Sequence, residues 1–212
     1  LHPIPCFFPQ PLRMEPTTEI RRLLDLMPAS GRMLTKIASK REQTKVIDYA
    51  FPLPWQQERR ISINFDLWRR LPQSQRDLLL LRTVSWLTAV RWFKADIYQG
   101  VVLAGILAAV VEIVQGDVVG TVAAGALTAI AGTRIWRNNR SSQAEVAADE
   151  AAVRIAGRRG YGEAEAAQHL LSAIEAVAQI EGRPTLDFME LLRSQNLQAI
   201  AGLSPVGIPQ RD

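Results

Sequence analysis

Two acidic residues, Glu145 and Asp149, stand four positions apart in a stretch whose sequence predicts a helix. At 3.6 residues per turn this spacing places both carboxylates on one helix face, where they could share a cation or hold an arginine. The same stretch also suits ordinary helix electrostatics. Ser142 and Glu145 have the spacing of a capping box, Asp149 lies in the early turns that favour negative charge, and Glu150 stands four residues before Arg154. Both interpretations stay open.

Residues that commonly hold metals or act as nucleophiles are scarce. The chain has two histidines, His2 and His169, and one cysteine, Cys6. The histidines do not form a pair at metal-ligand spacing, and a lone histidine lacks the convergent partners that a zinc site requires. Cys6 lies among prolines, with no neighbouring base in sequence to activate it. The sequence therefore predicts no catalytic residue, no bound metal and no cofactor.

The longest apolar stretch runs over forty residues, from Ile97 to Trp136, and contains three charged side chains. A polar turn at residues 115–117 divides it into two arms of eighteen residues each. As a helix, each arm would be about 27 Å long, close to the roughly 30 Å of a bilayer's hydrocarbon core. Small residues recur at four-residue spacing in both arms, which favours close helix packing in lipid. The sequence predicts a transmembrane hairpin; the alternative is a hairpin buried in a bundle or covered by a partner.

The charges that flank this stretch predict its orientation. Arg91 and Lys94 precede it and Arg137 and Arg140 follow it, whereas the turn between the arms carries only Asp117. Basic residues at the borders of a membrane segment favour the cytoplasmic side. We therefore expect an integral membrane protein with both polar halves of the chain in the cytoplasm.

Composition limits the expected partners. The chain has 25 Lys and Arg residues against 21 Asp and Glu residues, a net charge of +4, spread along its length. Dispersed arginines beside a membrane hairpin favour contact with anionic lipid headgroups. Basic pairs such as Arg59-Arg60 and Arg69-Arg70 are too few for a nucleic-acid face. The expected partners are membrane lipids and other membrane proteins, not nucleic acid, and the sequence leaves the oligomeric state open.

Local patterns predict a mainly α fold with a small β-hairpin. Strands are expected over residues 45–51 and 60–65, where apolar residues alternate around a turn marked by prolines. Apolar periodicity with start and stop signals predicts helices over residues 20–27, 32–39, 73–93, 142–156 and 163–180, and a last helix capped by Thr185. The helix from residue 73 is apolar nearly all round, so we expect it to be the central one.

These elements predict one domain interrupted by the hairpin. Met14 begins a well-formed segment after a proline-rich start. The expected units are a disordered tail or artefact (1–13), the first part of the domain (14–94), the hairpin (95–137), the second part (138–202) and a polar tail (203–212).

The order of elements resembles, over roughly residues 45–182, the layout of membrane-associated zinc metallopeptidases of the gluzincin type. In those enzymes a central helix carries HExxH, and a second helix opens with Glu-x-x-x-Asp, whose glutamate is the third zinc ligand. Glu145-Val-Ala-Ala-Asp149 resembles the second element, but Arg-Thr-Val-Ser-Trp stands in place of HExxH. The resemblance implies a degenerate pocket in which Arg82 pairs with Glu145 and replaces the charge of the metal. Its residues would be Arg82, Thr83, Trp86, Glu145 and Asp149.

Three stretches resemble a family of uncharacterised cyanobacterial proteins, a domain of unknown function. They are Met14–Gly31, Phe51–Trp55 and Gln75–Leu87. This resemblance implies a photosynthetic bacterial host and association with the plasma or thylakoid membrane. It implies no activity.

Two functions remain as hypotheses. The first is a non-catalytic membrane protein that binds or stabilises other membrane proteins through a decayed peptidase-like domain. The second is a hydrolase with an unrecognised site around Glu145 and Asp149. We favour the first, because a catalytic site needs a convergent acid, base or metal.

Overall fold

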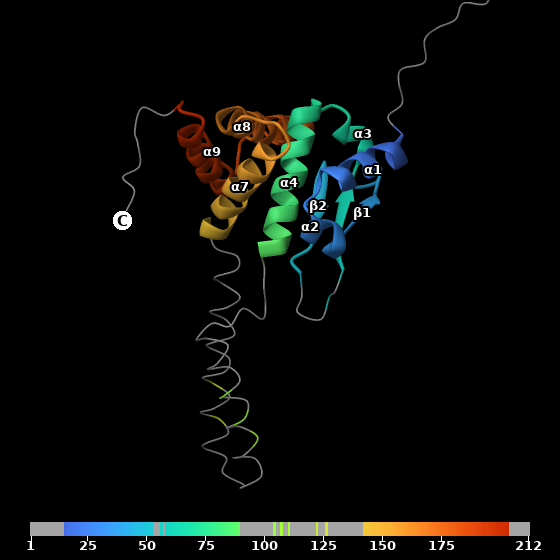
Figure 1. The fold of residues 1–212 in the computed structure, drawn as a ribbon, viewed down its shortest axis with the longest axis vertical. Coiled ribbons are helices and arrows are strands. Elements are labelled where there is room, and N and C mark those ends of the chain that lie inside the picture. The colour runs from blue at the N-terminus through green and yellow to red at the C-terminus, as the bar shows by residue number, and fades with distance from the viewer. Residues whose placement is uncertain are drawn as a thin grey trace, which may run out of the picture.

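A computed structural model describes residues 15–52, 56, 58–89 and 142–203, together with five single positions between 104 and 126. Its central element is helix α4 (Gln73–Ala89). Figure 1 shows a small sheet and the N-terminal helices on one side of α4 and the C-terminal helices on the other. The predicted mainly α fold with a small β component is confirmed.

The sheet has three strands, β1 (Thr35–Ser39), β2 (Ile47–Tyr49) and β3 (Arg59–Ile63), in the order β1-β3-β2. The predicted hairpin is present, because β2 pairs antiparallel with β3. Residues Ile61 and Ile63 of β3 are fully buried, as the period-two pattern predicts for one face of a strand.

The predicted helix over residues 32–39 is wrong. Helix α2 (Ala29–Leu34) begins and ends earlier, and Thr35 starts β1, which pairs parallel with β3. This strand depends on a partner that follows about twenty residues later, and local sequence does not reveal such a partner. The sheet therefore has one strand more than the predicted hairpin.

Two other N-terminal helices frame the sheet. Helix α1 (Pro16–Leu26) begins before the predicted start at residue 20, with a proline at its first position. Helix α3 (Phe65–Trp68) is a single turn, and the side chain of Asn64 accepts hydrogen bonds from the next helical N–H groups, those of Asp66 and Leu67.

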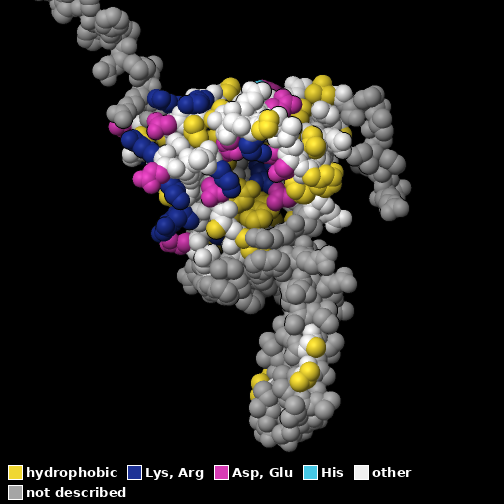
Figure 2. All heavy atoms as spheres, turned by 180° about the vertical axis from the view of Figure 1, so that it is seen from behind, with side chains coloured by type: hydrophobic (Ala, Val, Ile, Leu, Met, Phe, Trp, Pro, Cys, Tyr) yellow, Lys and Arg dark blue, Asp and Glu magenta, His cyan; other side chains and the backbone are white. Residues whose placement is uncertain are grey.

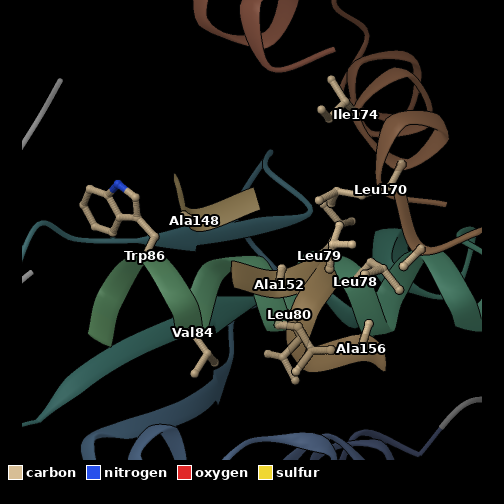
Figure 3. Close-up of a cluster of buried hydrophobic side chains, with 14 of the residues drawn as sticks. Leu78, Leu79, Leu80, Val84, Trp86, Ala148, Ala152, Ala156, Leu170 and Ile174 are labelled. Carbon is tan, nitrogen blue, oxygen red and sulfur yellow. The ribbon is translucent and has the colours of Figure 1, made fainter. Parts of the chain in front are cut away.

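Helix α4 is buried along most of its length, as its sequence predicts: every residue from Asp77 to Leu87 is buried. Figure 3 shows Leu78 and Leu80 of α4 beside Ala152 and Ala156, and Leu79 on the side of Leu170. Residues that precede the apolar stretch and residues that follow it therefore share one hydrophobic core.

Three helices complete the domain: α7 (Ser142–Gly157), α8 (Glu163–Ile180) and α9 (Phe188–Ile200). The bounds of α8 are those predicted. The predicted cap at Thr185 is wrong, because Asp187 and Glu190 form a reciprocal capping box. Asp187 sits directly before the first helical residue, so its carboxylate reaches the free N–H groups of the first turn.

The predicted transmembrane hairpin lies outside the described residues, apart from the five single positions, which are helical. Among the helices that the structure describes, none is long enough and apolar enough to cross a membrane. The side chains at three of the single positions, Leu107, Val110 and Val122, are exposed.

Candidate functional site

Arg82 of α4 faces two carboxylates of α7. Its guanidinium forms an ion pair with Glu145, and its Nε lies 3.5 Å from Oδ1 of Asp149. Arg82 is 5% exposed and Asp149 is completely buried. The predicted pair between Arg82 and Glu145 is present, so Glu145 is more than a helix-capping residue.

A second arginine, Arg193 of α9, holds Asp149. Its Nε and Nη2 donate to the two carboxylate oxygens of Asp149, each at 2.8 Å. This two-pronged geometry is the strongest that an arginine and a carboxylate form. The sequence alone did not identify Arg193, because it lies 44 residues from Asp149 and has no local motif. The acidic pair therefore holds arginines, in agreement with one of the two interpretations of its sequence.

Tyr49 of β2 completes the cluster from the sheet side. Nη1 of Arg82 donates to the Tyr49 hydroxyl, and the guanidinium carbon lies 5.7 Å from the centre of the Tyr49 ring. An arginine near an aromatic ring gains a cation–π attraction. Four elements, α4, α7, α9 and β2, therefore contribute side chains to one cluster of charged residues.

The other two predicted site residues, Thr83 and Trp86, make their contacts within the domain. The Thr83 hydroxyl donates to the carbonyl of Leu79, 2.8 Å away on the same helix. Trp86 is 6% exposed and packs against the rings of Tyr49 and Phe51, with centroids 5.2 and 5.8 Å away. Thr83 lines the pocket described next, whereas Trp86 does not. A binding role for either residue stays a prediction.

A pocket of about 570 Å³ opens above the cluster. Its walls carry charges of both signs that are mostly paired with each other, such as Arg183 with Glu190 at 2.7 Å and Lys45 with Asp48 at 3.1 Å. Apolar side chains complete the lining: Ile47, Leu79, Ile174, Val177 and Met189. Figure 2 shows the same mixture on one face of the domain, where Lys and Arg side chains lie among Asp and Glu side chains.

Burial and ion pairing act in opposite directions on the two arginines. Burial lowers the pKa of Arg82, yet an arginine starts so far above neutrality that it remains charged at pH 7. For Arg193 burial has the same effect, but the hydrogen bonds and charge of Asp149 outweigh it and raise the pKa. Two cations thus face two carboxylates, and the cluster is balanced in charge.

The pairing of the two carboxylates with two arginines limits the chemistry that the site can perform. A general base must be free to accept a proton, but Glu145 is paired with Arg82 and Asp149 with Arg193. Within the described parts of the chain, no three His, Cys, Asp or Glu side chains are grouped so that they could hold a metal ion. The arrangement is suited to recognition by shape and charge.

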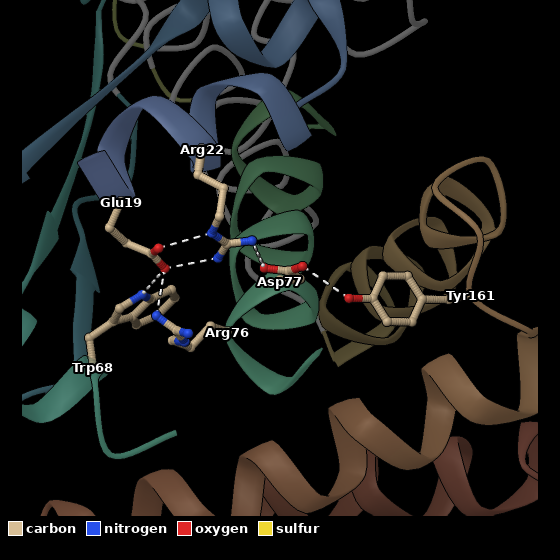
Figure 4. Close-up of polar contacts among 6 residues, drawn as sticks. All are labelled: Glu19, Arg22, Trp68, Arg76, Asp77 and Tyr161. Carbon is tan, nitrogen blue, oxygen red and sulfur yellow. Dashed lines mark hydrogen bonds and ion pairs between the residues drawn. The ribbon is translucent and has the colours of Figure 1, made fainter. Parts of the chain in front are cut away.

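A second polar cluster joins α1 to the turn before α8 (Figure 4). Glu19 is 6% exposed and accepts hydrogen bonds from Arg22, from Arg76 at 2.8 Å and from Nε1 of Trp68 at 3.2 Å. Arg22 also donates to Asp77 at 2.6 Å, and the Tyr161 hydroxyl donates to the other oxygen of Asp77 at 2.9 Å. No local sequence pattern indicates this cluster, because its members are spread over more than 140 residues.

The environment shifts the pKa of three groups in this cluster, Glu19, Arg22 and Tyr161. Burial alone would raise the pKa of Glu19, but the hydrogen bonds from Arg22 and Trp68 outweigh it and lower the pKa. Burial, together with the hydrogen bond to Asp77, raises the pKa of Tyr161 to about 12. The cluster therefore favours a charged Glu19 and a neutral Tyr161 at pH 7.

Comparison with known proteins places the chain in a family without assigning it an activity. No curated protein and no solved structure matches the chain. A family model described as "Protein of unknown function (DUF3318)" matches residues 21–161, which include Arg82, Glu145 and Asp149 but not Arg193. Because this match covers more than half of the 212 residues, the chain belongs to this family of proteins of unknown function, DUF3318.

Proposed function

We propose that the protein is a non-catalytic integral membrane protein, of the plasma or thylakoid membrane, whose domain binds or stabilises other membrane proteins. The main support is the pairing of Glu145 with Arg82 and of Asp149 with Arg193 and Arg82. These pairs occupy the carboxylates that a hydrolytic site would need free. The apolar sequence between Ile97 and Trp136 supports the membrane part of the proposal.

The pocket supplies the binding surface of this proposal. Its apolar walls and its charges of both signs suit a polypeptide segment, which offers apolar side chains together with polar groups. In the zinc-peptidase layout that the sequence resembles, Arg82 takes the position of the first metal-binding histidine. A guanidinium held by Glu145 then stands in for the charge of the metal.

The alternative is a hydrolase that uses Glu145. One observation favours it: Glu145 lines the pocket and its side chain is 21% exposed, so of the two carboxylates that face Arg82 it is the one that a ligand in the pocket could reach. For Glu145 to act as a base, Arg82 would have to release it. Stoichiometric zinc or peptide hydrolysis by the purified full chain would favour this alternative.

The membrane part is tested first. Full-length protein in membranes should resist extraction by alkaline carbonate, as an inserted hairpin does and a peripheral protein does not. In a Cys6→Ser background, Gly116→Cys should be labelled only from the non-cytoplasmic side and Ser141→Cys only from the cytoplasmic side. Release by carbonate, or labelling of both positions from one side, contradicts insertion as a hairpin.

The binding part is tested by crosslinking in membranes, detergent solubilisation and identification of the captured proteins. The pocket variant Met189→Glu places a charge on an apolar wall residue, and we expect it to lose the partners that the wild-type protein captures. The matched control is Leu203→Glu, an exposed apolar position that does not line the pocket. Capture of the same proteins at the same level by both variants contradicts binding through the pocket.

A further inference from the structure

Two apolar side chains stand in solvent at the end of α2. Met33 is 86% exposed and Leu34 is 37% exposed. Arg32 precedes them and Lys36 follows shortly after, with side chains 51% and 65% exposed. An exposed apolar pair between two cations suits a membrane interface, where apolar side chains become buried and cations meet anionic headgroups.

The contacts of strand β1, which begins two residues after Met33, show at which end of the domain Met33 lies. Thr35 pairs with Arg59 in the sheet, and the guanidinium of Arg59 donates to the carbonyl of Leu87, in the last turn of α4. Figure 1 shows the end of α2, the end of α4 and the start of α7 at the same end of the domain. Met33 is therefore at the end where the chain leaves α4 and returns to α7.

The chain that connects these two helices is the apolar stretch. Seven residues, 90–96, separate the last residue of α4 from Ile97, and five residues, 137–141, separate Trp136 from α7. At no more than about 3.6 Å per residue, these connections span at most roughly 25 Å and 18 Å. If the arms insert, as proposed above, this end of the domain is held close to the bilayer surface.

We infer that Met33 and Leu34, with Arg32 and Lys36, form a second membrane contact whose partner is the surface of a bilayer containing anionic lipids. Met33 and Leu34 enter the interface, and the two cations bind headgroups. Arg32 forms an ion pair with Asp25 at 3.8 Å, and Lys36 forms one with Glu58. Exposed ion pairs of this kind contribute little free energy, so headgroups can replace the carboxylates. The inference rests on the proposed membrane insertion and adds a contact that orients the domain.

The experiment uses full-length protein with Cys6→Ser, reconstituted into vesicles of phosphatidylcholine and phosphatidylglycerol. A polarity-sensitive fluorophore is attached to Met33→Cys, and in a separate sample to Leu203→Cys. Leu203 is the matched control because it is 57% exposed and follows α9 at the other end of the domain. We expect lipids with a quencher near the headgroup to quench the label at position 33 several times more strongly than the label at position 203.

The charges are tested in the same assay. Arg32→Glu combined with Lys36→Glu should reduce the quenching at position 33, and added salt should reduce it in the wild-type background, because headgroup attraction is screened. Quenching at position 33 that is unchanged by both treatments contradicts the role of the cations.

Resistance to carbonate, measured on the same vesicles, separates the two proposals. Resistant protein with equal quenching at positions 33 and 203 overturns the second contact and leaves the membrane insertion standing. Protein that carbonate releases overturns the insertion, and the second contact with it.

Discussion

At the scale of single residues, Arg82 carries a charge that is almost completely buried. Burial of such a charge is costly unless its partners compensate it. Three groups do so: Glu145, Asp149 and the Tyr49 hydroxyl. Among the described residues, Asp149 has a second cation in Arg193, whereas Glu145 forms an ion pair with Arg82 alone.

This asymmetry predicts the behaviour of a double-mutant cycle. Arg82→Met should lower the free energy of unfolding by about 3 kcal/mol or more, because it leaves buried carboxylates short of a cation. Glu145→Gln should cost less, because its side chain is 21% exposed and water screens the loss. Urea denaturation of the double variant should show a total cost smaller than the sum of the single ones, by about 1 kcal/mol or more.

The control for this cycle is the pair of Glu150 and Arg154. These residues are 3.9 Å apart on the exposed side of α7, so their coupling should be no more than about 0.5 kcal/mol. Additive effects of Arg82→Met and Glu145→Gln would mean that the two residues do not interact in solution.

Glu19 predicts how stability depends on pH. Its pKa in the folded protein lies below the ordinary value of 4.5, so the unfolded chain takes up the proton first as the pH falls. The stabilisation is present above about pH 4.5 and is lost as the pH falls through the folded pKa. Glu19→Gln should lower the free energy of unfolding at pH 7 and reduce the loss of stability that urea denaturation shows as the pH falls below about 4.5. Glu190, whose pKa is also lowered, should preserve part of the acid dependence. An acid profile of Glu19→Gln parallel to that of the wild type would contradict this role.

At the scale of elements, the close approach of α2 to α4 depends on a glycine. A Cβ added at Gly31 would lie 2.4 Å from Cγ1 of Val84, which is far inside van der Waals contact. Gly31→Ala should therefore push α2 away from α4 and cost about 1–3 kcal/mol, measured by thermal or urea unfolding.

Gly157 is the matched control for this substitution. It ends α7, and a Cβ there would meet nothing within 4 Å. Gly157→Ala should be neutral or stabilise by about 0.4–1 kcal/mol, because it restricts the unfolded chain. If Gly31→Ala behaves like Gly157→Ala, the two helices are not in tight contact.

At the scale of the whole molecule, the parts of the domain before and after the apolar stretch depend on each other. Leu78 and Leu80 belong to the same core as Ala152 and Ala156. Replacing residues 95–137 with a flexible polar linker should therefore leave a folded domain, since the end of α4 and the start of α7 lie at the same end of the domain. Calorimetry should show a single cooperative transition. Two separate transitions would mean that the two parts fold independently.

Much of this architecture follows from local sequence. The bounds of α8, the buried position of α4 and the β2–β3 hairpin follow from apolar periodicity and from prolines and glycines at the ends, because these act over a few residues. The spacing of Glu145 and Asp149 places both carboxylates on one helix face, and that too is a local property. The pairing of Arg82 with Glu145 was predicted from a resemblance in layout and not from any local pattern.

The tertiary structure decided the contacts that cross long distances in sequence. Strand β1 forms because β3 lies beside it, so residues 35–39 leave the helical pattern that predicted a helix there. Arg193 binds Asp149, and Tyr161 binds Asp77, across 44 and 84 residues. The sequence contains all of these residues but does not show which of them pair. Their pairing depends on which surfaces the packing of the core brings together.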